Sequence, residues 1–257
     1  MNVKTASEID PFVQDMIAGT NGLMYRPLIG RLDRYPVPKF PLPKCAGKFC
    51  LDIGSSWGRW SIAAAQEGYS VIGMDPSLEA IKAARRVARQ LGVSRVFYIV
   101  ADAKYLPFKE GSFDVVFSFS VLQHFSEENV KKTLTEVARV LKSGGISLIQ
   151  MANRYGLRNL FNQLKKGFKS PKAFDVRYWK PSELVKTFSR LIGSSRLQAD
   201  SFFCLNAQCG DIDLLPAHFR LVIRLSNLLT RRANEWPRLK HMADSVYVSS
   251  IKRGEPH

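Results

Sequence analysis

The chain is organised around one stretch, Phe49-Cys-Leu-Asp-Ile-Gly-Ser-Ser-Trp-Gly-Arg-Trp60. It opens with a short apolar run, residues 48–53, that is typical of a buried parallel strand, and it continues after a small-residue turn as an apolar-periodic helix. A strand that passes through such a turn into a helix opens a nucleotide-shaped crevice at its carboxyl end. Gly54 and Gly58 lack a Cβ, so the backbone can turn tightly and a flat ligand can approach it closely. The stretch therefore predicts a nucleotide-binding crevice.

Acidic residues end this strand and the next two strands along the chain. Asp52 lies in the last turn of the first strand, where a carboxylate contributes nothing to packing. The run Val71–Asp75 is a second strand that ends in an acid about 20 residues further on, the spacing at which a carboxylate accepts the hydroxyls of a ribose. The run Val100–Asp102 ends in the same way. These acids extend the predicted crevice.

Five motifs in this order resemble those of the class I S-adenosylmethionine-dependent methyltransferases, and most closely the branch that includes the ubiquinone and menaquinone precursor methylases. The motifs are Leu51-Asp-Ile-Gly-x-x-x-Gly58, Val71-Ile-Gly-Met-Asp75, Ala101-Asp-Ala103 with Leu106-Pro-Phe108, Phe113-Asp-Val-Val-Phe-Ser118 and Leu141-Lys-Ser-Gly-Gly-Ile146. They cover residues 48–151. The turn is not the G-x-G-x-x-G of dinucleotide-binding proteins, so an NAD(P) site fits less well. The sequence departs from the family at Ser56, where relatives usually have glycine.

The resemblance implies that the chain binds the methyl donor S-adenosylmethionine. Asp75 would accept both ribose hydroxyls, and Asp102 with Ala103 would meet the adenine. Ser120 and Gln123, just after the fourth strand, would approach the sulfonium or the methionine end. The implied cofactor-binding set is Asp52, Gly54, Ser56, Gly58, Asp75, Pro76, Asp102, Ala103, Ser120 and Gln123, in which the two glycines and Ser56 line the methionine and the ribose.

Two of these acids have an alternative role in local structure. Asp75 and Asp102 could instead serve as N-caps of helices expected near residues 78 and 104. The capping role and the ligand-binding role can coexist.

His124 is the candidate catalytic base. It follows the fourth strand, where members of the family place residues that face the substrate, and an imidazole has a pKa suited to deprotonating an alcohol or a phenol. The alternative is that His124 bonds the backbone and orders its loop. Metal-dependent relatives have an acid before a Leu-x-His run, whereas this chain reads Ser120-Val-Leu-Gln-His124. The cysteine pairs Cys45/Cys50 and Cys204/Cys209 also lack the usual zinc spacing, so no metal site is predicted.

The composition is that of a single soluble domain with a strongly basic charge. The chain has 257 residues, 46% of them hydrophobic, and a net charge of +16. Residues 151–257 hold 19 Lys and Arg against 8 Asp and Glu. This excess fits an anionic partner, such as nucleic acid, a lipid surface or a phosphorylated substrate, or else a simply solvated basic surface. No apolar run reaches the roughly 20 residues of a membrane span, and no signal-peptide pattern is present, so we expect a cytoplasmic protein.

The chain divides into an N-terminal extension, residues 1–44, and a methyltransferase domain, residues 45–257. Residues 25–43 are rich in proline yet apolar, which predicts an ordered ribbon packed over the core near the cofactor. Strands and helices alternate through the core, residues 48–151, which predicts a doubly wound, Rossmann-like α/β fold with helices on both faces of a mostly parallel sheet. The resemblance implies seven strands, the last antiparallel, with a lid-like helical insertion, residues 204–243, before it.

Residues 219–232 predict an amphipathic, basic helix within the insertion. Its apolar face consists of Phe219, Leu221, Val222, Leu225, Leu228 and Leu229, and its charge comes from Arg220, Arg224, Arg231 and Arg232. One interpretation packs the apolar face against the sheet edge or the lid and leaves the arginines in water. The other places part of that face and the arginines on an anionic lipid surface, so that the enzyme reaches a lipid-linked acceptor while remaining peripheral to the membrane.

Taken together, the motifs predict a methyltransferase that acts on a small or lipid-linked acceptor, with oxygen as the favoured atom. Enzymes that methylate amide or adenine nitrogen resemble one another in an Asn/Asp-Pro-Pro-Tyr motif, and this chain has Ser118-Phe-Ser-Val121 in that place. The basic C-terminal part favours the alternative, an RNA or protein methyltransferase. The sequence contains no recognisable RNA-binding module, however, so nucleic acid is the less favoured partner. A third hypothesis is a binding-only protein that has lost catalysis.

Overall fold

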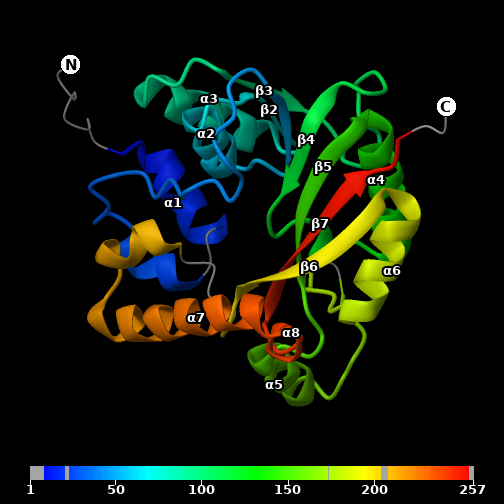
Figure 1. Ribbon diagram of the computed structural model, residues 1–257. Helices are drawn as coiled ribbons and strands as arrows, with labels where there is room; N and C mark the ends of the chain where they lie inside the picture. Colours follow the sequence, from blue (N-terminus) through cyan, green and yellow to red (C-terminus); the bar gives the residue numbers. More distant parts are fainter. Residues whose placement is uncertain (1–8, 21–22, 173, 204–207, 255–257) are drawn as a thin grey trace.

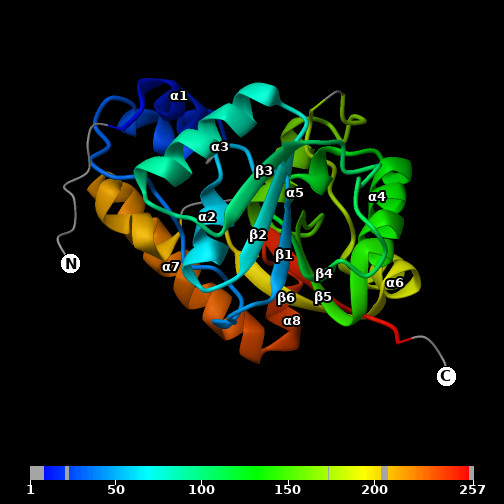
Figure 2. The same cartoon turned by 90° about the horizontal axis from the view of Figure 1, so that it is seen from above.

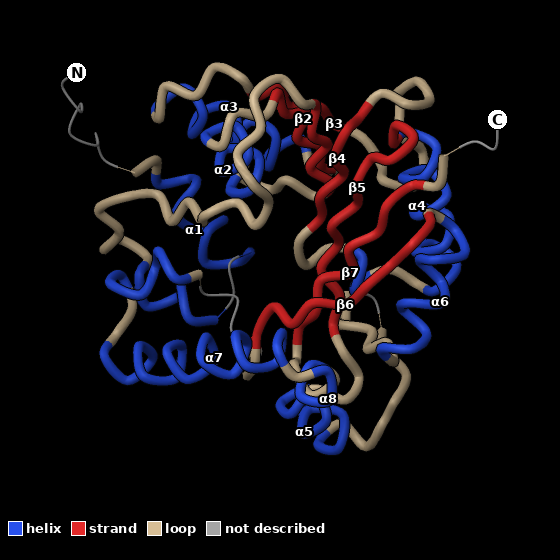
Figure 3. The backbone as a smooth tube through the Cα atoms, in the orientation of Figure 1, coloured by secondary structure: helices blue, strands red, loops and turns tan. Residues whose placement is uncertain are grey.

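The computed structural model describes residues 9–20, 23–172, 174–203 and 208–254 (Figure 1). Its centre is one continuous seven-stranded sheet in the order β3-β2-β1-β4-β5-β7-β6 (Figure 3). The strands are β1 Phe49–Ile53, β2 Ser70–Asp75, β3 Val96–Val100, β4 Phe113–Ser118, β5 Leu141–Ala152, β6 Gly193–Ser201 and β7 Ser245–Lys252. The first five strands pair in parallel, and β7 runs antiparallel to both β5 and β6. The predicted fold class and the antiparallel last strand are confirmed.

Helices cover both faces of the sheet, as the doubly wound prediction requires. Helices α2 and α3 lie on one face, and α4 and α6 lie on the other (Figure 2). The helices are α1 Pro11–Thr20, α2 Arg59–Gln66, α3 Leu78–Gln90, α4 Glu127–Val140, α5 Leu157–Lys165, α6 Pro181–Leu191, α7 Ala217–Glu235 and α8 Pro237–Lys240, with short 3-10 turns η1 Leu23–Leu28, η2 Leu122–His124 and η3 Cys209–Leu214. Burial of the strands on both faces explains why they read as continuous apolar runs in the sequence.

Serine side chains start two of the core helices. The Oγ of Ser77 accepts a hydrogen bond from Ala80 N at 3.2 Å at the start of α3, and the Oγ of Ser126 does the same for Asn129 N at 3.2 Å at the start of α4. Each bond satisfies an amide of the first helical turn that has no partner within its own helix. These caps fix where α3 and α4 begin and therefore where the loops after β2 and β4 end.

The described part of the N-terminal extension packs against the α2–α3 face of the sheet. Val13 and Ile17 of α1 and Tyr25 of η1 are buried in one cluster with Trp57 and Ile81. Further along, the proline-rich ribbon buries Phe40 against Tyr69 and Phe117, with ring centroids 5.5 and 5.1 Å apart. The ribbon is ordered because its apolar residues have this surface to cover.

Helix α7 of the insertion turns a different side inward from the one its pattern suggested. Ile223, Ser226 and Ala233 are its buried residues, whereas four of the six predicted face residues lie at the surface. Those four are Leu221, Val222, Leu225 and Leu228, exposed by 71, 37, 46 and 54%. The Oγ of Ser226 accepts from Phe202 N and donates to Phe202 O, each at 3.0 Å, so a polar contact with the end of β6 holds the helix. The interpretation that packs the whole apolar stripe inside is wrong.

The cysteines of the first strand region are free thiols. Cys50 is fully buried on β1, where it packs as a small apolar residue, and Cys45 is partly exposed. Cys204 lies outside the described residues. Across the ranges that the structure describes, no three or more His, Cys, Asp or Glu side chains cluster in a way that could hold a metal ion. Within the same ranges, no helix combines the length and the apolarity needed to cross a bilayer.

Candidate functional site

The loop after β1 is held in a conformation that only small residues adopt easily. Gly54, Ser56 and Gly58 all have left-handed backbone, with φ of 77, 47 and 89°. A Cβ on Gly54 would lie 2.2 Å from a methyl group of Val121, and one on Gly58 would lie 2.4 Å from the hydroxyl of Tyr98. Glycine is therefore required at both positions. Ser56 carries a backbone cost that a glycine would avoid, since an L-residue is disfavoured at positive φ.

Asp75 joins this loop to the end of β2. Its Oδ2 accepts a hydrogen bond from Ser56 N at 3.1 Å, and its Oδ1 accepts one from Ser77 N at 2.9 Å. The cap of α3 is Ser77, so the alternative that makes Asp75 the N-cap is wrong. An ionised carboxylate has about four acceptor sites, so two amide bonds leave room for the two hydroxyls of a ribose.

Asp102 and Ala103 lie at the same edge of the sheet as Asp75. Asp75 is paired in register with Val100 on the neighbouring strand, and Asp102 follows that strand by two residues. Asp102 is exposed, and its Oδ1 accepts from Lys104 N at 2.9 Å within a turn. No helix begins at residue 104, so Asp102 caps a turn and the expected helix there is wrong. Ala103 is 5% exposed and forms a small apolar surface beside it.

Asp52 supports the loop from beneath. Its carboxylate is 2% exposed, and its Oδ2 accepts a hydrogen bond from the Ser61 hydroxyl of α2 at 2.5 Å. Burial raises the pKa of Asp52 to about 7. Because this carboxylate is bonded inside the protein, its predicted contribution to the cofactor site is indirect. Pro76, by contrast, is exposed directly after Asp75.

Ser120 and Gln123, predicted to approach the sulfonium or the methionine end, contact each other in the loop after β4. Gln123 Nε2 donates to Ser120 Oγ at 2.7 Å, and Ser120 has left-handed backbone with φ of 61°. Ser118 Oγ donates to the Ile53 carbonyl at 3.0 Å, which ties the end of β4 to the end of β1. Val121 then packs against Gly54, where its methyl groups fill the space that a Cβ would need. The loop after β4 therefore lies beside the glycine loop.

His124 bonds the backbone, and the same bond fixes its tautomer. Its Nδ1 lies 2.7 Å from the carbonyl oxygen of Phe174. A carbonyl can only accept, so Nδ1 carries a proton, and Nε2 is the acceptor nitrogen of the neutral tautomer. That Nε2 lies 3.5 Å from Nε2 of Gln123, whose N–H can donate to it over this long distance. The bond to Phe174 thus gives His124 a role in ordering its loop, and Nε2 is left as the nitrogen that could accept a proton.

A polar chain that the sequence did not reveal runs from this loop across the sheet. Ser120 N donates to Gln150 Oε1 at 2.7 Å, Gln150 Nε2 donates to the hydroxyl of Ser245, and that hydroxyl donates to Asp200 Oδ2 at 2.7 Å. From the loop after β4 the contacts cross the next three strands in sheet order, since Gln150 is on β5, Ser245 on β7 and Asp200 on β6. Burial raises the pKa of Asp200 to about 6. The glutamine that interrupts the apolar residues near the end of β5 was the available signal.

Aromatic rings stand next to Ser120 on the α2 side. The rings of Trp60 and Phe119 are 4.7 Å apart between centroids, and Phe119 is 6.1 Å from Tyr247. Trp60 and Tyr247 are each 7% exposed, whereas Phe119 is half-buried. Trp60 and Tyr247 therefore belong to the core on this face of the sheet, and within this aromatic wall Phe119 is the ring that a flat organic group could contact.

Arg59, the first residue of α2, was also missed by sequence reasoning. Its guanidinium lies 5.8 Å from the Trp60 ring, and its Nη2 is 2.5 Å from Asp211 Oδ2 in the insertion and 3.1 Å from the Tyr25 hydroxyl in the N-terminal extension. Its Nε donates to Pro36 O at 3.0 Å. Arg59 therefore ties both segments outside the core to the glycine loop.

The chain is similar to methyltransferases in sequence. Residues 50–145 match the family model described as a methyltransferase domain. Uncharacterized methyltransferase YcgJ of Bacillus subtilis is 36% identical over 99 residues, 38% of each protein. The ubiquinone biosynthesis O-methyltransferase of Agrobacterium fabrum is 36% identical over 104 residues, 40% of each protein, and the demethylmenaquinone methyltransferase of Clavibacter sepedonicus is 39% identical over 100 residues, 39% of each. The chain spans about two fifths of the length of the curated relatives it matches.

Solved structures agree over a longer part of the chain. The YcgJ protein of Bacillus subtilis aligns with a TM-score of 0.56 at 25% identity, over 82% of this chain and 94% of that one. The complex between a methyltransferase and the Haloferax volcanii Trm112 methyltransferase activator aligns with a TM-score of 0.60 at 18% identity, over 96% of each chain, which shows a shared fold. Together with the sheet order and the glycine loop, these matches make residues 50–145 a methyltransferase domain of the class I, S-adenosylmethionine-dependent family.

Proposed function

We propose that the protein transfers a methyl group from S-adenosylmethionine to an oxygen atom of a small or lipid-linked acceptor. The observation that carries this proposal is the bond between Asp75 Oδ2 and Ser56 N, 3.1 Å long. It places a carboxylate with spare acceptor sites beside a loop whose glycines leave no room for a Cβ. A ribose and a methionine group fit that combination of a diol acceptor and an open backbone cradle.

The cofactor supplies an activated methyl group on a sulfonium, so the protein has mainly to bind, orient and exclude water. Asp75 would hold the ribose hydroxyls, and the backbone of residues 54–58 would approach the methionine part. Asp102 and Ala103 would lie against the adenine. Gln123 and Ser120, already bonded to each other at 2.7 Å, would position the sulfonium end.

The acceptor would lie between the loop after β4 and the aromatic wall. Phe119, half-buried against Trp60 and Tyr247, offers an apolar ring there, and the Nε2 lone pair of His124 would take a proton from an acceptor hydroxyl. A phenol combines a flat ring with a hydroxyl whose proton such a base can accept. Two relatives carry names from quinone biosynthesis, which supports a small aromatic acceptor.

The surface of α7 supports a lipid-linked acceptor. Leu221, Leu225 and Leu228 lie in solvent on a helix that also exposes Arg224 and Arg231. Apolar and basic side chains on one helix suit peripheral contact with an anionic membrane. Replacing Arg224 and Arg231 by Glu tests this contact better than changing Arg220, since Arg220 bonds the carbonyl of Leu215 at 2.8 Å and its loss would disturb the fold.

The alternative is an RNA or protein methyltransferase that uses the basic C-terminal part as its binding surface. The charge of residues 151–257 favours it, and so does the fold shared with a methyltransferase that binds the Trm112 activator. Methylation of an RNA or protein substrate, with no transfer to any phenol, would favour this alternative over the small acceptor.

Calorimetry with S-adenosylmethionine and its demethylated product tests the cofactor site. We expect binding by the wild type and strongly weakened binding by Asp75→Asn. The matched control is Glu110→Gln, because Glu110 is an exposed acid shortly before β4, at the opposite end of the sheet from the carboxyl ends of the strands. Transfer of a radiolabelled methyl group to a panel of phenols, one of them polyprenylated, then tests the acceptor class. Absence of binding by the wild type, or equal binding by Asp75→Asn, would refute the cofactor site.

A further inference from the structure

Helix α5 turns its apolar side to solvent. Leu157, Leu160, Phe161 and Leu164 recur at i, i+3, i+4 and i+7, the spacing of a single helix face, and they are exposed by 43, 41, 64 and 57%. The buried residue of the helix is polar: the side-chain amide of Asn159 donates to Asn153 O at 2.9 Å and to Asp244 O at 2.7 Å. A polar anchor therefore holds α5 on the protein, and a continuous apolar face is left at the surface.

Phe168 extends this apolar face beyond the end of α5. Gly167 and Phe168 both have left-handed backbone, with φ of 60 and 53°. For a bulky residue such a conformation is an outlier and costs free energy. The Phe168 side chain is nevertheless 55% exposed, so burial does not offset the cost. The bond from Phe168 N to Gln163 O, 2.9 Å long, keeps the strained turn in place and presents an aromatic ring to solvent.

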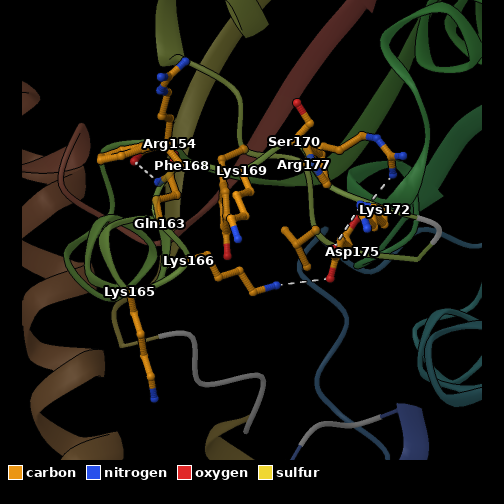
Figure 4. Close-up of a pocket in the computed structure, with 13 residues that line it drawn as sticks. Arg154, Gln163, Lys165, Lys166, Phe168, Lys169, Ser170, Lys172, Asp175 and Arg177 are labelled. Carbon is orange, nitrogen blue, oxygen red and sulfur yellow. Dashed lines mark hydrogen bonds and ion pairs between the residues drawn. The ribbon is translucent and has the colours of Figure 1, made fainter.

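A basic hollow of about 620 Å³ adjoins this face, and Phe168 is part of its wall. Its charged side chains are those of Arg154, Lys166, Lys169, Lys172 and Arg177, with Asp175 as the acid among them (Figure 4). Lys166 Nζ lies 3.1 Å from Asp175 Oδ1, and Figure 4 shows this pair reaching toward each other, whereas Lys165 points away. One carboxylate cannot balance five cations, so the hollow has a strongly positive potential.

We propose that α5, Phe168 and this hollow form a docking site for an anionic phospholipid surface. The apolar side chains would enter the boundary between headgroups and acyl chains, and the cations around the hollow would contact lipid phosphates. Charge complementarity selects this occupant, because a second copy of the chain would bring cations against cations. An apolar helix face with aliphatic leucines suits an acyl boundary better than RNA, whose bases stack on aromatic rings.

The docking site is connected to the loop that carries His124. Arg177 lines the hollow, and its Nη1 donates to the His124 carbonyl at 2.6 Å. The Nδ1 of His124 in turn bonds Phe174 O in the segment between Lys172 and Arg177. A lipid-linked acceptor would therefore arrive on the His124 side of the sheet edge. This inference rests on the proposed function, since it concerns how the enzyme would reach a lipid-linked acceptor. Lipid docking is measured without methyl transfer, so the docking site and the proposed function can fail separately.

Co-sedimentation of the full chain with phosphatidylcholine vesicles, with and without phosphatidylglycerol, tests the proposal. We expect binding only to the anionic vesicles and a sharp loss of it at high salt, since the screening length falls from about 10 Å at 0.1 M to about 3 Å at 1 M. Lys169→Glu with Lys172→Glu should lower the partition coefficient by at least about 25-fold, because one basic residue near an anionic surface contributes roughly fivefold. Phe161→Ser with Leu164→Ser should lower it by about tenfold or more.

Matched variants elsewhere on the surface are the controls. Arg89→Glu with Lys109→Glu makes the same change in net charge on exposed residues, and Phe97→Ser removes a ring that is 69% exposed on β3. Each should bind vesicles as the wild type does. Equal binding to neutral vesicles, unchanged binding by both α5-region variants, or the same loss in the controls would overturn the proposal. Retention of a labelled RNA without sedimentation on anionic vesicles would overturn it in favour of nucleic acid. Calorimetry with S-adenosylmethionine on each variant reports the cofactor site separately.

Discussion

Arg59 and Asp211 lie 152 positions apart in the chain and form a buried ion pair, with Nη2 2.5 Å from Oδ2 and side chains only 5 and 2% exposed. The Tyr25 hydroxyl bonds both partners. One arginine next to Gly58 thus joins the N-terminal extension and the insertion to the loop that would hold the cofactor. The position of both outer segments depends on this contact.

We expect Asp211→Ala to destabilise the protein by about 3–5 kcal/mol, because it leaves the Arg59 charge buried without its partner. The double variant Arg59→Met with Asp211→Leu should cost less than the single change, since it removes both charges. Urea unfolding of the three proteins measures the difference. A single variant as stable as the wild type would show that the ion pair does not hold the outer segments in place.

The buried carboxyl of Asp52 should make stability depend on pH. Burial raises its pKa to about 7, whereas the unfolded chain has the ordinary value of about 3.9. Between these values the folded state keeps a proton that the unfolded state has lost, so stability falls as the pH rises through this window. Asp52→Asn cannot ionise and can still accept the bond from Ser61. Relative to the wild type, it should gain about 2 kcal/mol in unfolding free energy between pH 5 and pH 7.

Urea unfolding of wild type and Asp52→Asn at several pH values checks this prediction. Asp33→Asn changes an exposed acid and should follow the wild-type profile at every pH. Parallel profiles for wild type and Asp52→Asn would mean that Asp52 is ionised in the folded protein at neutral pH.

The two roles of His124 can be separated by choice of substitution. His124→Asn keeps a side-chain N–H that can donate to Phe174 O but removes the lone pair that accepts a proton. If His124 is the base, methyl transfer by this variant should fall roughly 10²–10⁴-fold with unchanged cofactor affinity. His124→Ala should lose the loop contact as well. Near-normal turnover by His124→Asn combined with a defect in His124→Ala would assign the residue to loop order alone.

The chain of polar contacts through Gln150 should be needed for a stable site. Gln150→Leu leaves Ser120 N and the Ser245 hydroxyl without their present partner in a buried region, which should cost about 1–3 kcal/mol per group. It should also weaken cofactor binding, because Ser120 sits in a left-handed conformation that this bond helps to hold. Gln66→Leu, on the exposed side of α2, is the control. Thermal unfolding measures the loss of stability, and calorimetry measures the loss of cofactor affinity. Unchanged cofactor affinity would show that these polar contacts have a structural role only.

Local patterns in the sequence were sufficient to predict the sheet and the turn after its first strand. The strand, turn and helix at residues 49–66 were predictable because the turn restricts which residues can occupy it. Only glycine fits at Gly54 and Gly58, where a Cβ would collide with Val121 and Tyr98. Helix starts were predicted unevenly: the helix expected near residue 78 begins there as α3, whereas no helix begins at residue 104. Asp75 lies two residues before the true cap, Ser77, and a short polar side chain at either position produces the same local pattern.

Features that depend on distant parts of the chain could not be predicted from the sequence. The Arg59–Asp211 pair and the contacts of Gln150 with Ser245 join residues that no sequence spacing relates. The inward side of α7 was also mispredicted, since Ser226 rather than a leucine forms the anchoring contact with β6. Hydrophobic periodicity predicts burial only when the apolar face meets the core, and in α5 and α7 it does not.

The place of β7 between β5 and β6 sets an order of events during synthesis. β6 is made before β7 yet hydrogen-bonds to it alone, so residues 193–201 have no strand partner until the ribosome has produced residues 245–252. Until then β5 also presents an open edge of unpaired amides and carbonyls. The nascent chain therefore holds two strands without their partner while all of α7 and α8 is being translated, and during that interval both can pair with other chains.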